Sequence, residues 1–198
     1  PTPLHGFKGH MWEQLALPFQ VRGKTLWSPA NTGPLAVKNQ VVSIMDMSTI
    51  EHPEWFSNNY SQWYQIIIPK LAKKVTKILT ISEYSRNQIA KICQVDVNKV
   101  AVTPLAADPR FERKPAEEVS LVRKKLGIPK GRYILALSSL EPRKNLERLL
   151  VAWAGLLSRV PKDLWLVVAG AKGKALVFKG VSFEILPSRV YLTGYVPD

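Results

Sequence analysis

Two adjacent cations, Arg143 and Lys144, lie in a short polar segment that could bind phosphate groups. They follow Ser139 and Glu141 and stand between an expected strand and an expected helix that starts near Asn145. Two cations beside a helix N-terminus are unfavourable there, so an anionic ligand between them would be stabilising. Backbone amides of the turn would add donors for phosphate oxygens. The pattern predicts a diphosphate site; the alternative is a solvated Arg-Lys pair in a loop.

Polar side chains also follow two expected strands in the first half of the chain. Asp46 ends the apolar segment 40–45, and Ser82, Glu83 and Arg86 follow the segment 75–81. Because α/β sheets present ligand groups at the carboxyl ends of their strands, Asp46 is a candidate for a ligand site. Asp46, Ser82 and Glu83 also have purely structural interpretations. Ser82 and Glu83 also fit an N-cap with an acid in the first helical turn, and Asp46 fits the cap of a turn.

Alternating strand and helix patterns surround these candidates. The segments rich in β-branched and apolar residues predict strands at 40–45, 75–81, 100–105, 133–137, 164–169 and 189–193. Helical spacing predicts helices at 59–72, 82–93, 116–126 and 145–157. Pro69 is expected to kink or divide the first of these helices. The stretch 172–186 fits neither period.

The order of these elements predicts an α/β fold with two doubly wound, Rossmann-like units. Residues 108–115 combine prolines with charged side chains and show no sustained period, which is typical of an inter-domain linker. We therefore expect one domain within residues 1–107 and a second within residues 116–198.

Composition limits the classes of partner. The net charge of +13 is spread over both halves and implies attraction to nucleic acid, to a phosphorylated small molecule or to an anionic lipid surface. The chain has no recognition helix, zinc site or basic-aromatic strand pattern, which disfavours a nucleic-acid-binding module. No apolar run approaches the roughly 18 residues of a spanning helix. A single cysteine excludes an internal disulfide, so a reducing cytoplasm is the expected location.

The ordered set of motifs resembles family 4 glycosyltransferases of the bacterial mannosyltransferase kind across nearly the whole chain. These motifs are Trp12-Glu13-Gln14, the segments 26–34, 41–46, 52–56, 79–86 and 102–105, and Glu141-Pro142-Arg143-Lys144-Asn145. The resemblance implies the two-domain GT-B fold, with each domain only partly represented. Residues 1–107 would be the C-terminal portion of the acceptor-side domain. Residues 116–198 would be the first portion of the nucleotide-sugar-binding domain.

The resemblance also implies an activity, which is transfer of a hexose with retention from a nucleoside diphosphate sugar. Mannose is the favoured sugar and GDP-mannose the favoured donor, with no metal ion or other cofactor. The acceptor would be a saccharide or a lipid-linked saccharide in cell-surface polysaccharide biosynthesis. We expect a cytoplasmic transferase that contacts the anionic inner face of the cell membrane and does not bind nucleic acid.

Site residues follow from the same resemblance, position by position. The donor diphosphate would be held by Arg143 and Lys144, in a region that includes Ser139 and Glu141. The inter-domain cleft on the acceptor side would be lined by Ser82, Glu83 and Arg86. The strand-end carboxylate of Asp46 would face the acceptor.

The sequence departs from the family pattern in four places. Met45 stands where many relatives have a histidine before the strand-end aspartate, and Ser139 where relatives often have a basic residue. The Gly-rich loop and the Glu-x7-Glu element are absent. These 198 residues alone are therefore expected to be inactive. The absence of Glu-x7-Glu also leaves open a non-catalytic, GT-B-like binding protein.

Overall fold

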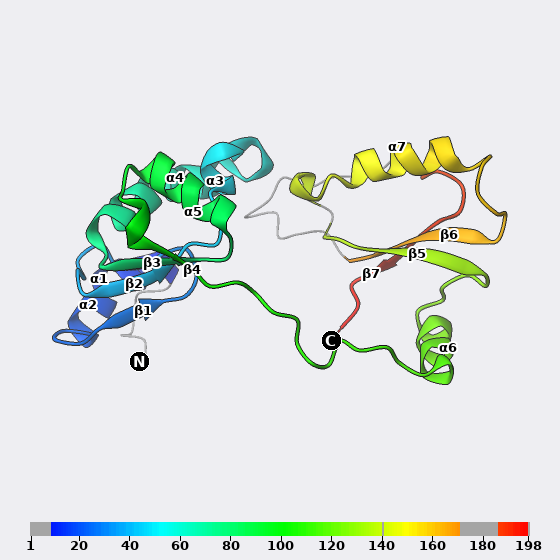
Figure 1. The fold of residues 1–198 in the computed structure, drawn as a ribbon, viewed down its shortest axis with the longest axis horizontal. Coiled ribbons are helices and arrows are strands. Elements are labelled where there is room, and N and C mark those ends of the chain that lie inside the picture. The colour runs from blue at the N-terminus through cyan, green and yellow to red at the C-terminus, as the bar shows by residue number, and fades with distance from the viewer. Residues whose placement is uncertain (1–8, 140, 171–185, 198) are drawn as a thin grey trace. The chain divides into compact units, whose positions relative to one another are not determined.

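A computed structural model describes residues 9–139, 141–170 and 186–197 of the chain (Figure 1). The main boundary between its two compact units falls between Ala107 and Asp108. Each unit contains its own parallel sheet and its own apolar core. The assignment of the two units to acceptor and donor binding stays a prediction.

The sheet of the first unit is formed by parallel strands in the order β1-β2-β3-β4. The strands are β1 (Leu26–Ser28), β2 (Gln40–Ser43), β3 (Lys77–Thr80) and β4 (Val100–Val102). Parallel pairing puts the carboxyl ends of all these strands at one edge, which is where β2 leads to Asp46 and β3 to Ser82. Strands β2 and β4 end earlier than expected, at Ser43 and Val102, and β1 was not predicted.

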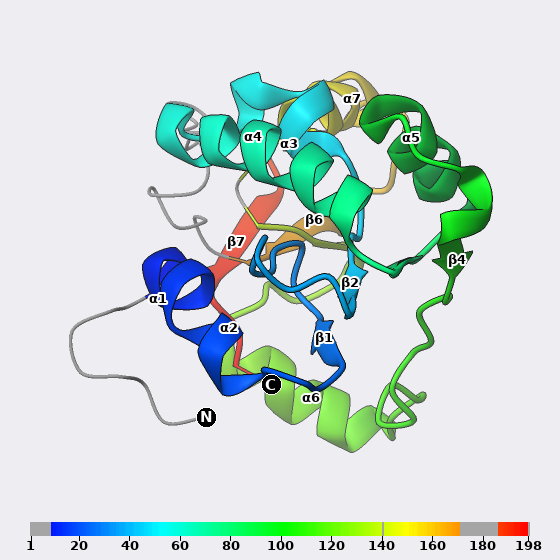
Figure 2. The same ribbon diagram turned by 90° about the vertical axis from the view of Figure 1, so that its left-hand side faces the viewer.

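Helices α4 (Asn58–Lys74) and α5 (Glu83–Cys93) lie over one face of this sheet (Figure 2). Their apolar side chains meet Val42 and Ile78 of the strands in a core whose members are almost completely buried. The core also contains Ile44, Met47, Tyr64, Ile67, Ile68, Leu71, Ala72, Val75, Ile89, Cys93 and Val100. This core fixes the face on which each helix lies and therefore where α5 begins.

Helix α4 is continuous through Pro69, so proline does not divide this segment, and a kink, which was the other expected outcome, stays a prediction. Proline cannot donate a backbone hydrogen bond to the carbonyl group four residues earlier. Apolar residues on both sides of it, Ile67 and Ile68 before and Leu71 after, are nevertheless buried. Their burial favours one uninterrupted helix despite the lost hydrogen bond.

Short helical segments complete the first unit. They are α1 (Gly9–Leu15), α2 (Leu17–Gln20), α3 (Ser48–Glu51) and the 3-10 turn Val97–Lys99. A further 3-10 turn is formed by Pro53–Trp55. The imidazole of His10 in α1 lies 5.2 Å from the ring of Trp63 in α4, measured between centroids. This contact places α1 beside α4.

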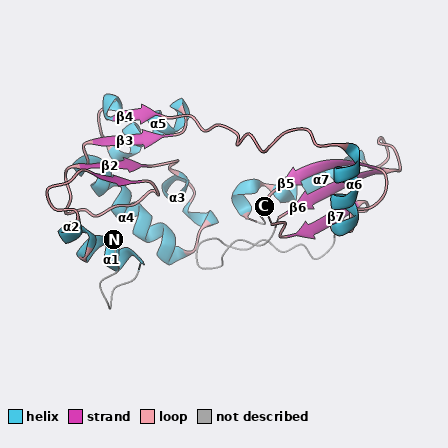
Figure 3. Cartoon of the chain, turned by 90° about the horizontal axis from the view of Figure 1, so that it is seen from below, coloured by secondary structure: helices cyan, strands magenta, loops and turns pink. Residues whose placement is uncertain are grey.

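The second unit has parallel strands in the order β5-β6-β7, all pointing the same way (Figure 3). They are β5 (Arg132–Leu137), β6 (Leu164–Ala169) and β7 (Val190–Gly194). Helix α7 (Leu146–Leu156) covers one face, and α6 (Ala116–Lys125) precedes β5. These elements match the predicted order of helices and strands. Apart from Leu186, the stretch 172–186 lies outside the described residues.

The core of the second unit is formed where α7 meets β6. Leu146, Leu150 and Trp153 pack against Leu166 and Val168 of the sheet. The indole Nε1 of Trp153 donates a hydrogen bond of 3.1 Å to the backbone oxygen of Ser188. Leu149 and Leu156 follow the same helical spacing but lie at the margin of this face, since Leu149 is 38% and Leu156 44% exposed. The buried stripe of α7 is therefore narrower than its apolar pattern predicts.

None of the helices formed by the described residues has both the length and the hydropathy required to cross a bilayer.

The core of the first unit can be tested within a single helix. Ile68→Ala should lower the free energy of unfolding by about 3 kcal/mol, because it leaves a cavity beneath the sheet. Ile66→Ala is the matched control, because Ile66 lies on the same helix but is 54% exposed. It should change the free energy by less than about 0.5 kcal/mol. Urea unfolding of both variants measures the difference; equal effects would contradict the assigned core.

Candidate functional site

In the second unit, the backbone segments at the carboxyl ends of the three strands lie close together and are joined by hydrogen bonds. The Ser138 amide donates to the Ala169 carbonyl at 2.9 Å, and the Gly170 amide donates to the Gly194 carbonyl at the same distance. A Cβ atom on Gly170 would come within 2.1 Å of the Ser138 oxygen. Gly170 also has φ +142°, so a side chain at this position is excluded by both sterics and backbone conformation. The three strand ends therefore meet closely at the edge where parallel sheets bind ligands.

Between β5 and α7 the chain makes a hydrogen-bonded turn. The amide of Glu141 donates to the Ser139 carbonyl at 2.9 Å, and the amide of Lys144 donates to the Glu141 carbonyl at 3.1 Å. Residues Pro142–Lys144 form a single 3-10 turn. Asn145 then adopts the left-handed conformation with φ 53°, and α7 begins at the next residue. The turn thus brings together all four residues predicted for the donor diphosphate: Ser139, Glu141, Arg143 and Lys144.

An ion pair inside this turn was not predicted from the sequence. Glu141 is only 5% exposed, and its Oε2 accepts a hydrogen bond of 2.8 Å from Nε of Arg143. A buried carboxylate needs such a charged partner, because it has lost its hydration. Part of the positive charge of Arg143 is therefore balanced by the protein itself. The pairing also restricts the orientation of the guanidinium group.

Lys144 differs from Arg143 in its surroundings. It is exposed, and in the described part of the chain its ammonium group has no hydrogen-bond or ion-pair partner. It stands directly before Asn145 and α7, whose first turn carries the positive end of the helix dipole. Lys144 is therefore the cation of this turn whose charge is most available to a ligand.

At the carboxyl edge of the first sheet, Asp46 caps a turn. Its Oδ1 accepts hydrogen bonds from the backbone amide of Ser48 at 2.9 Å and from Oγ of Ser48 at 2.5 Å. The side chain is exposed. The structural interpretation of Asp46 is thus confirmed, and its role toward an acceptor stays a prediction.

Asn31 holds the loop that carries Asp46, and the sequence analysis did not single it out. Its amide donates to the Ser43 carbonyl at 2.9 Å, and its Oδ1 accepts from the Met45 amide at 2.8 Å. Asn31 has φ 58°, a conformation that asparagine tolerates better than most residues. A sequence signal for this role of Asn31 was present in the motif at 26–34, where the asparagine directly precedes Thr32-Gly33.

Glu13 and Gln14 connect α1 to the loop that contains Asn31. Oε2 of Glu13 accepts a hydrogen bond of 2.8 Å from Oγ1 of Thr32. The Gln14 side chain donates to the Gly33 carbonyl at 2.9 Å and accepts from the Leu35 amide at 3.0 Å. Two of the motifs that resemble glycosyltransferases therefore form one hydrogen-bonded unit beside Asp46.

The three residues predicted for the acceptor cleft occur together at the start of α5. Oγ of Ser82 accepts a hydrogen bond of 3.1 Å from the Ser85 amide, so Ser82 is the N-cap. Arg86 pairs with Glu83 at 3.3 Å and also donates to the Val97 carbonyl at 3.3 Å. Each residue therefore has a structural task, and a contact with substrate stays a prediction for all three.

Within the described ranges, no cluster of three or more histidine, cysteine, aspartate or glutamate side chains has the proximity required to hold a metal ion. The metal-independence of the site stays a prediction.

Comparisons with known proteins extend over most of the chain. No protein-family model matches it. A curated relative, O-antigen chain mannosyltransferase B of Escherichia coli, is 25% identical over 168 residues, which are 83% of this chain and 44% of that protein. The crystal structure of Anabaena HepE in complex with UDP-glucose matches 80% of this chain and 42% of its own, with a TM-score of 0.57 and 19% identity. HepE in complex with UDP and glucose matches 79% of this chain, with a TM-score of 0.57 and 18% identity.

The fold is of the GT-B type. The predicted fold class is therefore confirmed, as an α/β chain with parallel sheets that represents part of such a protein. The chain spans less than half of the length of the relatives that it matches.

The N-cap at Ser82 can be tested by two substitutions. Ser82→Ala should lower the free energy of unfolding by about 1 kcal/mol, because the Ser85 amide loses its side-chain acceptor. Ser82→Asp keeps an acceptor in the cap and should remain close to the parent protein. Denaturant unfolding measures both effects. Equal stability of the alanine variant and the parent protein would show that the cap contributes nothing.

Proposed function

We propose that the protein is a glycosyltransferase that moves a hexose from a nucleoside diphosphate sugar to a saccharide acceptor, with retention at the anomeric carbon. The observation that carries this proposal is the turn before α7, which presents Lys144 and the oriented Arg143 at the carboxyl edge of a parallel sheet. The similarity of the chain to the O-antigen mannosyltransferase and to HepE, whose structure contains UDP-glucose, supports the same activity.

In the proposed reaction, the bond between the sugar and the diphosphate breaks, and negative charge develops on the leaving diphosphate. Lys144 would stabilise that charge directly, because it has no described protein partner to exchange for the phosphate. Arg143 would contribute through its guanidinium while Glu141 keeps Nε in place. The amide groups in the first turn of α7 would supply further donors.

This arrangement supplies the charge that a metal ion would otherwise provide, and we propose that transfer is metal-independent. Ser139 contributes through its backbone, whose carbonyl fixes the Glu141 amide at the start of the turn. The glutamate is therefore a positioning residue for Arg143 rather than a contact to the anionic diphosphate, which its own charge would repel.

On the acceptor side, we propose that Asp46 accepts a hydrogen bond from an acceptor hydroxyl group. Oδ1 is held by Ser48, which leaves the carboxylate exposed in a fixed orientation. The acceptor would also be contacted by Ser82, Glu83 and Arg86, which the capped start of α5 keeps in place.

We favour mannose as the sugar and GDP-mannose as the donor, because the motif resemblance and the name of the E. coli relative agree. UDP-glucose is the competing donor, since HepE binds it. The proposed acceptor is a saccharide, lipid-linked in the favoured case, in the synthesis of a cell-surface polysaccharide. The proposed location is the cytoplasmic face of the membrane.

A donor panel tests this function. The intact protein is incubated with GDP-, UDP- and dTDP-sugars, and release of the nucleoside diphosphate is measured with and without saccharide acceptors. Turnover of one donor, with the anomeric configuration retained in the product, is the expected result. Tight binding of a nucleotide sugar without turnover would instead support a non-catalytic binding protein.

Lys144→Ala should weaken binding of a nucleoside diphosphate by about 30-fold, because a hydrogen bond to a charged group contributes about 2 kcal/mol. Binding of the nucleoside alone should be almost unchanged. The matched control is Lys162→Ala, an exposed lysine before β6 at the opposite edge of the same sheet. Isothermal titration measures the three proteins. Equal losses for nucleoside and diphosphate in the Lys144 variant would refute the phosphate contact.

A further inference from the structure

The second unit has a cationic groove formed by α6 and by the loops on either side of it. The groove has a volume of about 1420 Å³ and is lined by residues between Arg113 and Gly131. We call it the α6 groove. Its cationic lining residues are Arg113, Lys114, Arg123, Lys124 and Lys130, and its described lining contains no acidic side chain. A concentration of positive charge of this kind attracts an anionic partner.

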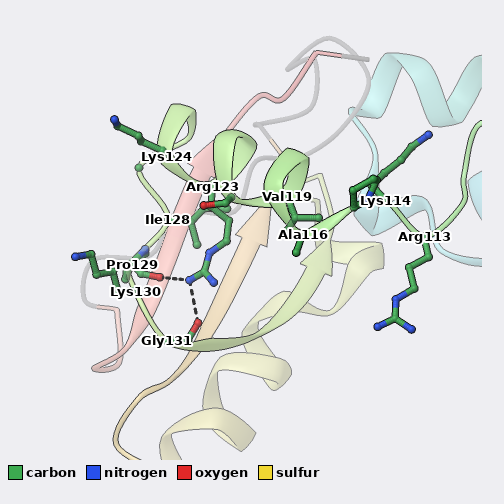
Figure 4. Close-up of a pocket in the computed structure, with 13 residues that line it drawn as sticks. Arg113, Lys114, Ala116, Val119, Arg123, Lys124, Ile128, Pro129, Lys130 and Gly131 are labelled. Carbon is green, nitrogen blue, oxygen red and sulfur yellow. Dashed lines mark hydrogen bonds between the residues drawn. The ribbon is translucent and has the colours of Figure 1, made fainter.

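Arg123 has a structural role in the groove. Its Nη2 donates to the carbonyl groups of Pro129 and Gly131, at 2.5 and 2.9 Å, and its guanidinium lies 5.1 Å from the centre of the Tyr133 ring. These contacts fix the loop that follows α6. As a result, Lys124 and Lys130 extend toward the same side of the groove (Figure 4).

Three of the four other cations that line the groove are available for binding. Lys114 pairs with Glu112 at 2.8 Å. In contrast, the side chains of Arg113, Lys124 and Lys130 have no hydrogen-bond or ion-pair partner among the residues that the structure describes. All three are exposed, so binding an anion would break no described ion pair.

Helix α6 itself has an unusual surface. It contains no buried residue, and Leu121 on its outer side is 69% exposed. Leu121 lies one turn before Lys124 and Lys125, so an apolar side chain and two cations share one helix face. The acids Glu117 and Glu118 are in the first turn, which leaves the C-terminal end of the helix strongly positive. An exposed apolar residue beside cations is typical of helices that lie at a lipid headgroup layer.

The direction of the side chains distinguishes an extended partner from a small anion. Arg113 and Lys114 point away from Lys124 and Lys130 (Figure 4), so these four cations do not converge on one phosphate. They suit an array of separated negative charges. We propose that the α6 groove docks the second unit on anionic lipid headgroups. This proposal deepens the proposed function, on which it rests, by naming the surface that brings the transferase to a lipid-linked acceptor.

Co-sedimentation with vesicles tests the proposal. The intact protein should bind phosphatidylcholine vesicles that contain phosphatidylglycerol, and should not bind vesicles of phosphatidylcholine alone. The double variant Lys124→Ala/Lys130→Ala should bind the anionic vesicles about 30-fold more weakly, since each basic residue near such a surface contributes about a fivefold gain in affinity. Added salt should weaken binding of the parent protein.

The matched control is Lys24→Ala/Lys91→Ala, which removes the same charge from two exposed lysines of the first unit. It should lose less than about threefold, since those lysines lie outside the groove. Equal losses in the two double variants would overturn the proposal, because general charge would then explain binding. Absence of binding to anionic vesicles, or equal binding to neutral ones, would also overturn it. So would displacement of the protein from vesicles by soluble glycerol phosphate, which would indicate a small-anion site.

Nucleotide-sugar binding is measured on the same proteins without vesicles. It should be unchanged in the Lys124→Ala/Lys130→Ala variant, whose residues are outside the donor turn. Vesicle binding that persists in a protein without donor binding would contradict the proposed function and leave lipid docking supported. Donor turnover without vesicle binding would contradict lipid docking alone.

Discussion

The ion pair between Glu141 and Arg143 is the interaction on which the proposed donor site depends. Burial of the Glu141 carboxylate is unfavourable without a charged partner, and the Arg143 Nε at 2.8 Å supplies one. The pair holds the backbone between β5 and α7 in a compact turn and leaves Lys144 as the exposed cation. The glutamate in the Glu-Pro-Arg-Lys-Asn motif thus orients Arg143, and we propose that it does not itself contact the donor.

The first unit uses its motif residues in a similar way. Asp46 and Ser82 make contacts that build the loops at the carboxyl edge of the sheet, and Arg86 links α5 to the 3-10 turn that precedes β4. Asn31 and the residues of α1 then fasten those loops to one another. Such contacts are compatible with substrate binding, because a polar side chain already held by the protein loses little conformational freedom when a ligand arrives.

Elements with a strong local pattern were predicted well, including the helix capped by Ser82 and the first strand of the second unit, which was expected to start at residue 133. The β1 strand escaped prediction because its three residues are too few to show alternation. Pro69 does not divide α4, because the burial of neighbouring isoleucines, a tertiary effect, outweighs a local propensity. Arg143 and Lys144 were singled out from their charge and position, and Ser139 and Glu141 from the family resemblance; donor binding by this turn stays a prediction. The Glu141–Arg143 pair was not predicted, because it requires the 3-10 turn and the left-handed Asn145 that bring the two side chains together.

The central claim is that the turn before α7 holds a diphosphate while a sugar leaves it. A crystal structure of the intact protein with a bound nucleoside diphosphate tests this claim most directly. We expect a phosphate oxygen within hydrogen-bond distance of Nζ of Lys144, at the N-terminus of α7, with the Glu141–Arg143 pair intact. A diphosphate bound away from this turn would contradict the account.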